Sequence, residues 1–172
     1  MLLGPPGNLR AGACRALLRA GRGEPAMIVE PVGANDPELR ASLSEAALPT
    51  DDLAEPGRAF FRFVDEGSTI GFGGLEAYGE NVLLRSIVIV PEARGRGLGR
   101  RATGLLLEQA RATGARRAYL LTTDAGPFFE ALGFRTVARE NAPADILATR
   151  QAVSLCPSTA ALMARPIPGH MK

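Results

Sequence analysis

Histidine and lysine are almost absent from this 172-residue chain, and each scarcity excludes a kind of chemistry. The only histidine, His170, stands near the end of the sequence, which argues against a histidine-based metal site or a Ser-His catalytic triad. The only lysine is Lys172, so the Lys-Ser or Lys-Thr pair of a P-loop is missing. Cys14 and Cys156 are far apart, which predicts no disulfide framework and indicates a cytoplasmic location. No metal site is expected.

Long apolar runs and a strong net charge are also missing. No apolar run approaches the ~20 residues that span a bilayer, and a formal net charge of +2 is too small to indicate a nucleic-acid partner. The length suits one domain with a proper core, which we expect at residues 27–165. Residues 1–26 are interpreted as a disordered extension, with a transit peptide as the alternative, and residues 166–172 as a flexible tail.

The chain is organised around one stretch in which a strand, a glycine loop and a helix follow one another. Residues 84–90 are apolar and β-branched, and Pro91 ends the strand because proline cannot donate to a sheet ladder. Arginine and glycine are interleaved through residues 94–99, and a helical pattern of apolar residues follows. The unpartnered amides and the dipole of a helix N-terminus favour a polyphosphate ligand there. An arginine-rich surface turn is the alternative interpretation.

The other segments predict a mixed-sheet α/β layer fold. Asn35 or Asp36 is expected to cap a first helix, and Gly114 to end the central one. Further strands are expected at residues 27–32, 59–64, 69–78, 117–122, 134–139 and 158–163. Further helical segments are expected at residues 14–20, 49–53, 125–132 and 143–151.

Two motifs carry a resemblance to a known family. The glycine loop matches V-x-P-x-x-R-G-x-G-L-G from Ile89 to Gly99, with isoleucine in place of the first valine, and Phe128-Phe-Glu-Ala-Leu-Gly-Phe134 is similar to F-Y-E-x-L-G-F. The sequence therefore resembles the GNAT N-acetyltransferases over residues 27–165. The resemblance implies a mixed central sheet flanked by helices, with two splayed parallel strands forming an acetyl-CoA cleft. A dinucleotide fingerprint, Gly97-x-Gly99-x-x-Ala102, is also present but lies mid-chain and after a further loop, so it is the weaker interpretation.

The resemblance also assigns residues to acetyl-CoA. It implies that the backbone of β-strand residues 87–89 binds the pantetheine arm, and that loop amides hold the pyrophosphate. An amine then attacks the thioester directly, without a covalent enzyme intermediate. Phe129 falls where the family often has a tyrosine that protonates the departing thiolate, and phenylalanine cannot donate a proton. The implied cofactor-binding residues are Ile87, Val88, Ile89, Arg94, Gly95, Arg96, Gly97, Leu98, Gly99, Arg100 and Phe129.

Acid–base and acceptor residues are less sharply indicated. Deprotonating an α-amine at neutral pH costs about 1.4 kcal/mol, against roughly 4–5 for a lysine amine, so a weak base or a water chain suffices for an α-amino substrate. Glu76 is the candidate base, and a solvated strand carboxylate is the alternative interpretation. Guanidinium groups bind carboxylates bidentately, which favours an acidic acceptor. The candidate acceptor-binding residues are Arg85, Ser86, Thr122 and Arg150. A surface ion pair is the alternative interpretation for the two arginines, and a cap of the following helix is the alternative for Thr122.

A finer resemblance favours the GNAT group found with arsenic-resistance genes. It rests on segments that include Leu84-Arg-Ser86, Leu120-Leu-Thr-Thr123 and Ser154-Leu-Cys-Pro-Ser158. It implies acetylation of a small, acidic amino-acid-like amine, with an arsenic-containing analogue as one candidate; Cys156 alone is poor support for an arsenic ligand. Two alternatives stay open: a protein or peptide N-acetyltransferase, and a non-catalytic acyl-CoA sensor. A homodimer also stays open.

Overall fold

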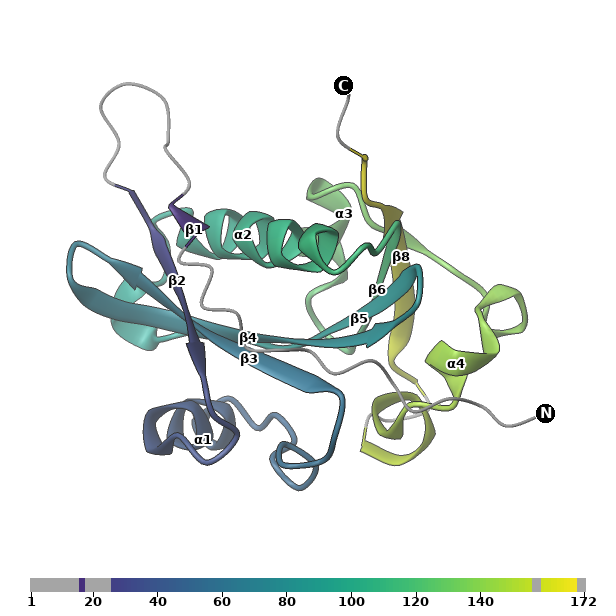
Figure 1. Ribbon diagram of the computed structural model, residues 1–172, viewed down its shortest axis with the longest axis horizontal. Helices are drawn as coiled ribbons and strands as arrows, with labels where there is room; N and C mark the ends of the chain where they lie inside the picture. Colours follow the sequence, from purple (N-terminus) through teal and green to yellow (C-terminus); the bar gives the residue numbers. More distant parts are fainter. Residues whose placement is uncertain (1–15, 18–25, 156–158, 170–172) are drawn as a thin grey trace.

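The computed structural model of the chain describes residues 16–17, 26–155 and 159–169. Within this part, eight strands form one sheet in the order β1-β2-β3-β4-β5-β6-β8-β7 (Figure 1). The strands are β1 Ala16–Leu17, β2 Ile28–Val32, β3 Arg58–Asp65, β4 Ser68–Tyr78, β5 Asn81–Ile89, β6 Arg117–Thr122, β7 Arg135–Thr136 and β8 Ala161–Pro166. The helices are α1 Pro37–Glu45, α2 Leu98–Ala112, α3 Gly126–Ala131 and α4 Ala144–Leu147. Neighbouring strands are antiparallel except β5 and β6, which are parallel.

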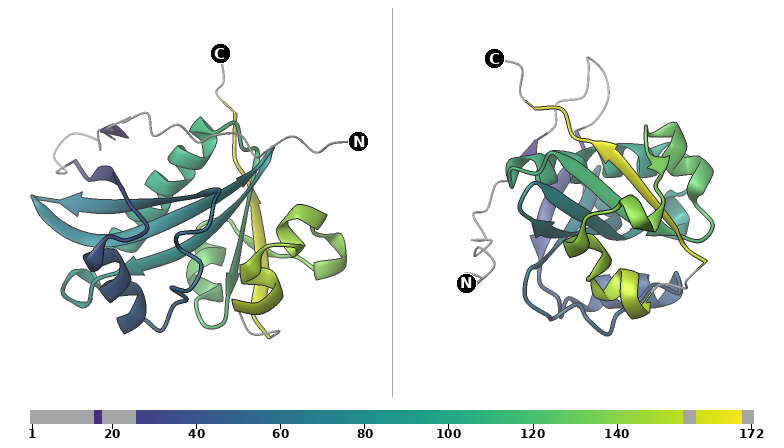
Figure 2. Two further views of the ribbon diagram at one scale, coloured as in Figure 1. Left: turned by 60° about the horizontal axis from the view of Figure 1, so that its bottom comes forward. Right: turned by 90° about the vertical axis from the view of Figure 1, so that its right-hand side faces the viewer.

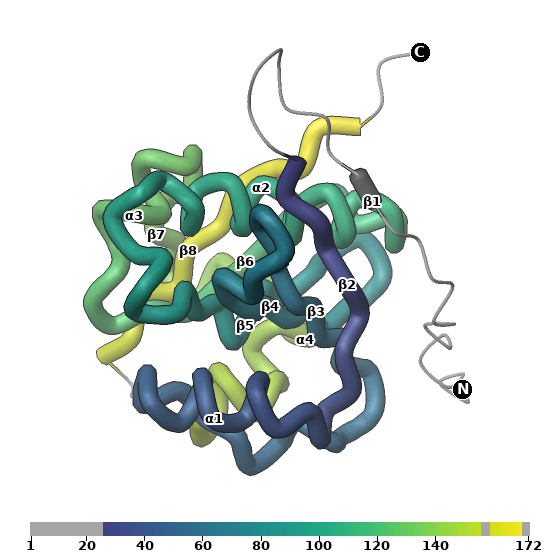
Figure 3. Tube along the Cα trace, turned by 90° about the vertical axis from the view of Figure 1, so that its left-hand side faces the viewer, coloured from purple at the N-terminus to yellow at the C-terminus, as the bar shows by residue number. Residues whose placement is uncertain are grey.

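Helices α1 and α2 cover opposite faces of this sheet (Figures 1 and 3). Phe60 and Phe61 are successive residues of β3, and they enter different hydrophobic clusters because side chains alternate along a strand. Phe61 packs in the larger cluster with the apolar stripe of α2, whereas Phe60 packs with Leu39 and Leu43 of α1. The stripe of α2 consists of Leu98, Ala102, Leu105, Leu106 and Ala110. The expected mixed-sheet α/β fold, with helices on its faces, is confirmed.

A third cluster forms around α4, on the side of the molecule where β8 lies (Figure 2). Ile146 of α4 is fully buried there against Leu83 of β5 and Tyr119 of β6. Because Leu83 and Leu84 face opposite sides of the sheet, β5 contributes to both this cluster and the α2 cluster. Strand β5 is therefore buried on both faces over its first half.

The helix start that was predicted from a local N-cap is confirmed. Asp36 is the N-cap of α1, since its Oδ1 accepts a hydrogen bond from the amide of Leu39 at 3.0 Å. The expectation of helix at residues 49–53 was wrong, because residues 51–53 form turns, and the Asp52 carboxylate accepts hydrogen bonds from Arg58 and Arg85 of the sheet. The expected strand at 134–139 was too long, since β7 covers only Arg135–Thr136.

Two further expectations differ near the ends of the chain. The helix expected at 143–151 stops at Leu147 and a π-helical turn follows at Gln151–Leu155 (η3). Thr149 explains the break, since its hydroxyl bonds the Ile146 carbonyl and accepts from the Ala152 amide, which competes with helical pairing. At the other end, Ala16 and Leu17 lie within the predicted basic helix at 14–20 but pair with β2 as a strand.

Packing continues past the predicted domain boundary at residue 165. Strand β8 includes Pro166, and Ile167 is buried and donates its amide to the Arg116 carbonyl at 2.8 Å. Cys14, Cys156 and His170 lie outside the described residues. Among the described residues, no helix combines the length and apolarity needed to cross a membrane. The same residues contain no group of three or more His, Cys, Asp or Glu side chains suited to a metal ion.

Candidate functional site

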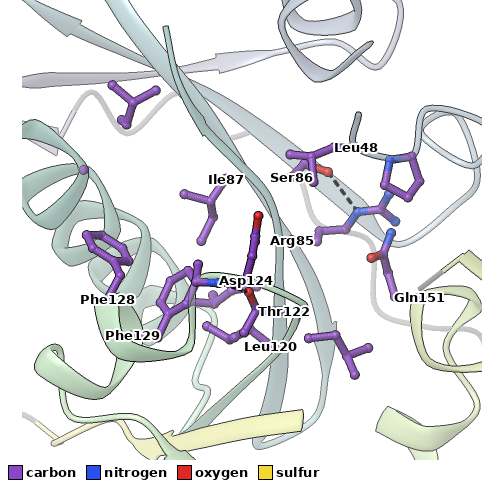
Figure 4. A pocket seen from close by; sticks show the side chains of 16 residues that line it. Leu48, Arg85, Ser86, Ile87, Leu120, Thr122, Asp124, Phe128, Phe129 and Gln151 are labelled. Carbon is purple, nitrogen blue, oxygen red and sulfur yellow. Dashed lines mark hydrogen bonds between the residues drawn. The ribbon is translucent and has the colours of Figure 1, made fainter. Parts of the chain in front are cut away.

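Parallel strands β5 and β6 diverge, and a cavity lies between them. Their pairing covers only three residue pairs, from Asn81 with Arg117 to Leu83 with Tyr119, although both strands continue further. The cavity has a volume of about 260 Å³ (Figure 4). Its walls come from the diverging strands, from α2 and α3, and from the segments at residues 48–49 and 151. Its lining residues are Leu48, Pro49, Leu84, Arg85, Ser86, Ile87, Ile89, Gly99, Leu120, Leu121, Thr122, Asp124, Ala125, Phe128, Phe129 and Gln151.

A β-bulge in β5 accompanies this divergence. Strand β4 advances two residues, from Phe72 to Gly74, while β5 advances three, from Arg85 to Val88, so Gly73 faces an extra residue. Ser86 has φ +56°, a left-handed conformation that is uncommon outside glycine. The bulge reverses the alternation of side chains, because Leu84 packs on the α2 face and Val88 on the α1 face. Consequently the side chain of Val88 points away from the cavity that Ile87 and Ile89 line.

The glycine loop brings a helix N-terminus to this cavity. After a 3-10 turn at Pro91–Ala93 (η1), Gly95 and Gly97 adopt positive φ of +81° and +71°, and α2 begins at Leu98. The first amides of a helix have no intrahelical acceptor and carry the positive end of its dipole. Gly99 lies in the first turn of α2 and also lines the cavity, so the cavity and the helix N-terminus are continuous.

Arginines surround this N-terminus. Arg94, Arg96 and Arg100 are exposed, and Arg94 donates its Nε hydrogen to the Ile89 carbonyl at 3.0 Å. Arg96 also forms an ion pair with the buried carboxylate of Asp65, at 3.6 Å. Leu98 is buried in the core, so only its backbone is available at the loop. Exposed positive charge, free amides and glycines without Cβ atoms fit the pyrophosphate of an acyl-CoA.

A buried ion network lies under the opposite part of the cavity. Asp52 binds the Arg85 guanidinium through both oxygens, at 2.5 and 2.6 Å, and Arg85 also donates to Glu76 at 3.2 Å. Arg58 donates to Asp52 at 3.0 Å and lies 3.5 Å from Glu76. Burial alone raises the pKa of Asp52, but the hydrogen bonds and charges of Arg85 and Arg58 outweigh it and hold this pKa below its ordinary value. The Asp52 carboxylate is therefore held in its ionised form despite burial.

Glu76, the candidate base, is part of this network. It is only 1% exposed and is not among the residues that line the cavity. Its Oε1 accepts from the Tyr78 hydroxyl at 2.7 Å and its Oε2 accepts from Arg85. Burial, followed by this hydrogen bond to Glu76, raises the pKa of Tyr78. The role of Glu76 as a base stays a prediction, and its proton path would have to run through other groups or water.

Three of the four candidate acceptor-binding residues line the cavity, and the fourth does not. Arg85, Ser86 and Thr122 line the cavity, and Arg85 lies beside Ser86 in Figure 4. Arg150 is exposed, is not a lining residue and forms an ion pair with Glu55. Asp124 and Gln151 line the cavity but were missed, although each adjoins a predicted residue or segment. Leu48 was also missed, because its sequence position gives no signal of the fold that brings it to β5.

Phe129 occupies the position of the tyrosine that the motif often carries. It is 7% exposed, lines the cavity, and packs edge to face with Phe128 at 5.0 Å and with Phe134 at 5.7 Å between ring centroids. Neither Phe128 nor Phe129 can donate or accept a proton. The α3 side of the cavity therefore supplies apolar contact (Figure 4).

Solved structures share this fold at low sequence identity. An N-acetylglutamate synthase from Neisseria gonorrhoeae, complexed with coenzyme A and N-acetyl-glutamate, aligns with a TM-score of 0.66 and 17% identity, over 83% of this chain and 35% of that chain. An aminoglycoside 6'-N-acetyltransferase complexed with coenzyme A aligns with a TM-score of 0.57 and 21% identity, over 84% of this chain and 99% of that chain. At these identities, the comparison establishes the fold alone.

Sequence comparisons agree with the fold. An uncharacterized N-acetyltransferase of Escherichia coli K12, YjgM, is 32% identical over a 92-residue alignment that covers 49% of this chain. The alignment spans 55% of that curated relative, about half its length. The family model for the acetyltransferase (GNAT) family matches residues 29–134, from β2 through the end of α3. This match covers more than half of the chain and includes the bulged β5, the glycine loop and α2. The chain therefore belongs to the acetyltransferase (GNAT) family.

Proposed function

We propose that this protein transfers an acetyl group from acetyl-CoA to the amine of a small molecule by direct attack. The observation that carries the proposal is the continuity between the β5–β6 cavity and the N-terminus of α2, which meet at Gly99. A thioester in the cavity and a pyrophosphate at the helix N-terminus would together use both features. Acetyl-CoA supplies the activated acyl group.

The residues of this chain would hold the cosubstrate in two ways. The backbone of β5, freed from β6 beyond Leu83, offers hydrogen-bonding groups at Ile87, Val88 and Ile89 for the amides of the pantetheine arm. The amides of residues 95–100, with Arg94, Arg96 and Arg100, would neutralise the pyrophosphate. Phe129 and Phe128 would exclude water from the arm.

The size of the cavity supports a small acceptor over a protein chain. At about 260 Å³ it is bounded by Leu48 and Gln151 near Arg85, and by Phe128 and Phe129 across from them (Figure 4). The narrower prediction of an acidic acceptor now depends on Arg150, because the guanidinium of Arg85 already binds Asp52 and Glu76. The arsenic-containing analogue stays a prediction, as do the cytoplasmic location and a homodimer.

One observation favours a second candidate, a non-catalytic acyl-CoA sensor. Phe129 provides no acid for the departing thiolate, and Glu76 is buried in ion pairs away from the cavity. Catalysis is nevertheless favoured over sensing. A thiol has a pKa of about 8.5, so its thiolate departs without protonation more readily than an alkoxide, and an α-amine needs only a weak base.

A thiol-release assay distinguishes the candidates. The full chain is incubated with acetyl-CoA and a panel of acidic amino acids, arsonic and phosphinic amino-acid analogues, polyamines and short peptides, and free CoA thiol is measured. Selective turnover of a small amine supports the enzyme, and turnover of peptides alone would redirect the proposal to protein acetylation. Acetyl-CoA binding by calorimetry without turnover of any amine would leave the sensor.

A further inference from the structure

Ser86 has an unusual position for a strand residue. It is half-buried, lines the cavity, and stands in the bulge of β5 with φ +56°. Left-handed backbone is costly for residues with a Cβ atom and is concentrated at functional sites. A glycine would relieve this strain, so a serine here requires a reason beyond the backbone.

The hydrogen bonds of Arg85 determine the direction of the Ser86 hydroxyl. Arg85 donates its Nε hydrogen to Ser86 Oγ at 3.2 Å (dashed in Figure 4). Arginine has only donors, so this bond occupies an acceptor lone pair of the hydroxyl and leaves its proton for another partner. Asp52 and Glu76 hold the rest of the guanidinium, so Arg85 cannot turn away from Ser86. The proton of Ser86 is therefore directed away from Arg85.

The buried charges also strengthen Ser86 as a donor. A hydroxyl that accepts a hydrogen bond from a cation donates a stronger one itself, because bonds in a chain polarise each other. Only two hydroxyls line the cavity within the described residues, those of Ser86 and Thr122. Thr122 Oγ1 accepts from the Ala125 amide at 3.0 Å, a neutral donor, so it lacks this polarisation. Phe128 and Phe129 contribute no polar hydrogen.

We propose that the Ser86 hydroxyl is a catalytic hydrogen-bond donor to the acyl oxygen, an inference that rests on the proposed function. As the C–N bond forms, negative charge develops on this oxygen. The C–S bond then breaks, its electron pair leaves with sulfur as the CoA thiolate, and the proton released by the amine passes to water. Ser86 keeps its own proton throughout. Phe129 lacks the hydroxyl that a tyrosine would have, and the Ser86 hydroxyl partly compensates by stabilising the negative charge that develops on the acyl oxygen.

Three variants test this proposal: Ser86→Ala, Ser86→Gly and, as a matched control, Glu66→Gly. Glu66 also has positive φ, +50°, but lies in the β3–β4 turn and does not line the cavity. Hydroxylamine, a small nucleophile that needs little acceptor recognition, is used with acetyl-CoA, and both CoA thiol and acetohydroxamate are measured. Acetyl-CoA affinity is measured separately by calorimetry.

Both Ser86 variants are expected to lose about 10- to 100-fold in kcat, less than the ~100- to 1,000-fold that follows loss of a primary oxyanion donor, with little change in acetyl-CoA affinity. Glu66→Gly should keep wild-type kcat. If Ser86 served only the backbone, Ser86→Gly would be as active as wild type, because glycine suits the positive φ, and this result would overturn the proposal. Absence of turnover in the wild type, with hydroxylamine and every amine of the panel, would overturn the proposed function itself.

Discussion

Asp52 binds both terminal nitrogens of the Arg85 guanidinium, at 2.5 and 2.6 Å, although the two residues are 33 positions apart in the chain. Asp52 belongs to the same connection between α1 and β3 as Leu48 and Pro49, which form a wall of the cavity. Arg85 belongs to β5, the strand across the cavity from β6. The pair therefore fixes the position of this wall relative to the strand that carries Ser86.

We predict that Asp52→Asn strongly destabilises the protein. The Asp52 side chain is fully buried, and its neutralisation leaves two largely buried guanidinium groups, Arg85 and Arg58, sharing Glu76 as their buried counter-charge; loss of one partner from a buried ion pair typically costs about 3–5 kcal/mol. The measurement is the free energy of unfolding by denaturant titration. The neighbouring Asp51 is exposed, so Asp51→Asn is the matched control and should change this free energy by no more than about 0.5 kcal/mol. Equal effects of the two variants would contradict the assigned role of Asp52.

The same pair predicts a loss of stability in acid. The folded-state pKa of Asp52 lies below its ordinary value of 3.8, so its contribution to stability is fully present above that value and is lost as the pH falls through the lower folded-state pKa. We expect the unfolding free energy of the wild type to decline below pH ~4, with a smaller decline in Asp52→Asn. Parallel pH profiles for the two proteins would show that other carboxylates account for the acid sensitivity.

Local patterns in the sequence predicted the parts of the fold that local chemistry determines. Pro91, the alternating glycines and the apolar stripe after them sufficed for the end of β5, the loop and α2, because each signal lies within a few residues of the feature it specifies. Asp36 as a helix cap is a similar case. The expected helix at 49–53 was wrong, and there Asp52 binds Arg85, 33 positions away, a contact that no local pattern encodes.

The candidate site shows the same division. Phe129 and the glycine loop came from motifs, and both adjoin the cavity. The partners of Arg85 and the left-handed backbone of Ser86 depend on how β4 and β5 pair around Gly73, which the sequence does not reveal. The sequence therefore identified the hydrogen-bond donors and acceptors of the site but not which of them bind each other. It could not show that the Arg85 guanidinium binds Asp52.

We predict that the surface ion pair between Arg150 and Glu55 contributes little to stability but influences the KM of an acidic acceptor. Their side chains are 44% and 38% exposed, and exposed pairs contribute about 0–1 kcal/mol, so Arg150→Gln, which leaves the second ion pair of Glu55 with Arg58 intact, should change the unfolding free energy by less than about 1 kcal/mol. If Arg150 binds an acceptor carboxylate, Glu55→Gln removes a competitor and lowers the KM of acidic amines, whereas Arg150→Gln raises it. Neutral amines are the internal control and should show unchanged KM. An equal response of acidic and neutral amines would exclude Arg150 from acceptor recognition.

Glycine substitutions at two positions of the α2 region should have opposite effects. Gly97 caps α2 with φ +71°, so Gly97→Ala forces alanine into left-handed backbone and should cost about 1–2 kcal/mol. Gly104 is exposed within α2, and a Cβ there would meet nothing within 4 Å, so Gly104→Ala should stabilise the helix by about 0.5–1 kcal/mol. Because the glycine loop is proposed to hold the pyrophosphate, Gly97→Ala should also weaken acetyl-CoA binding, measured by calorimetry, and Gly104→Ala should not. Unchanged acetyl-CoA affinity in Gly97→Ala, at a temperature where the variant is folded, would show that the pyrophosphate does not bind at this loop.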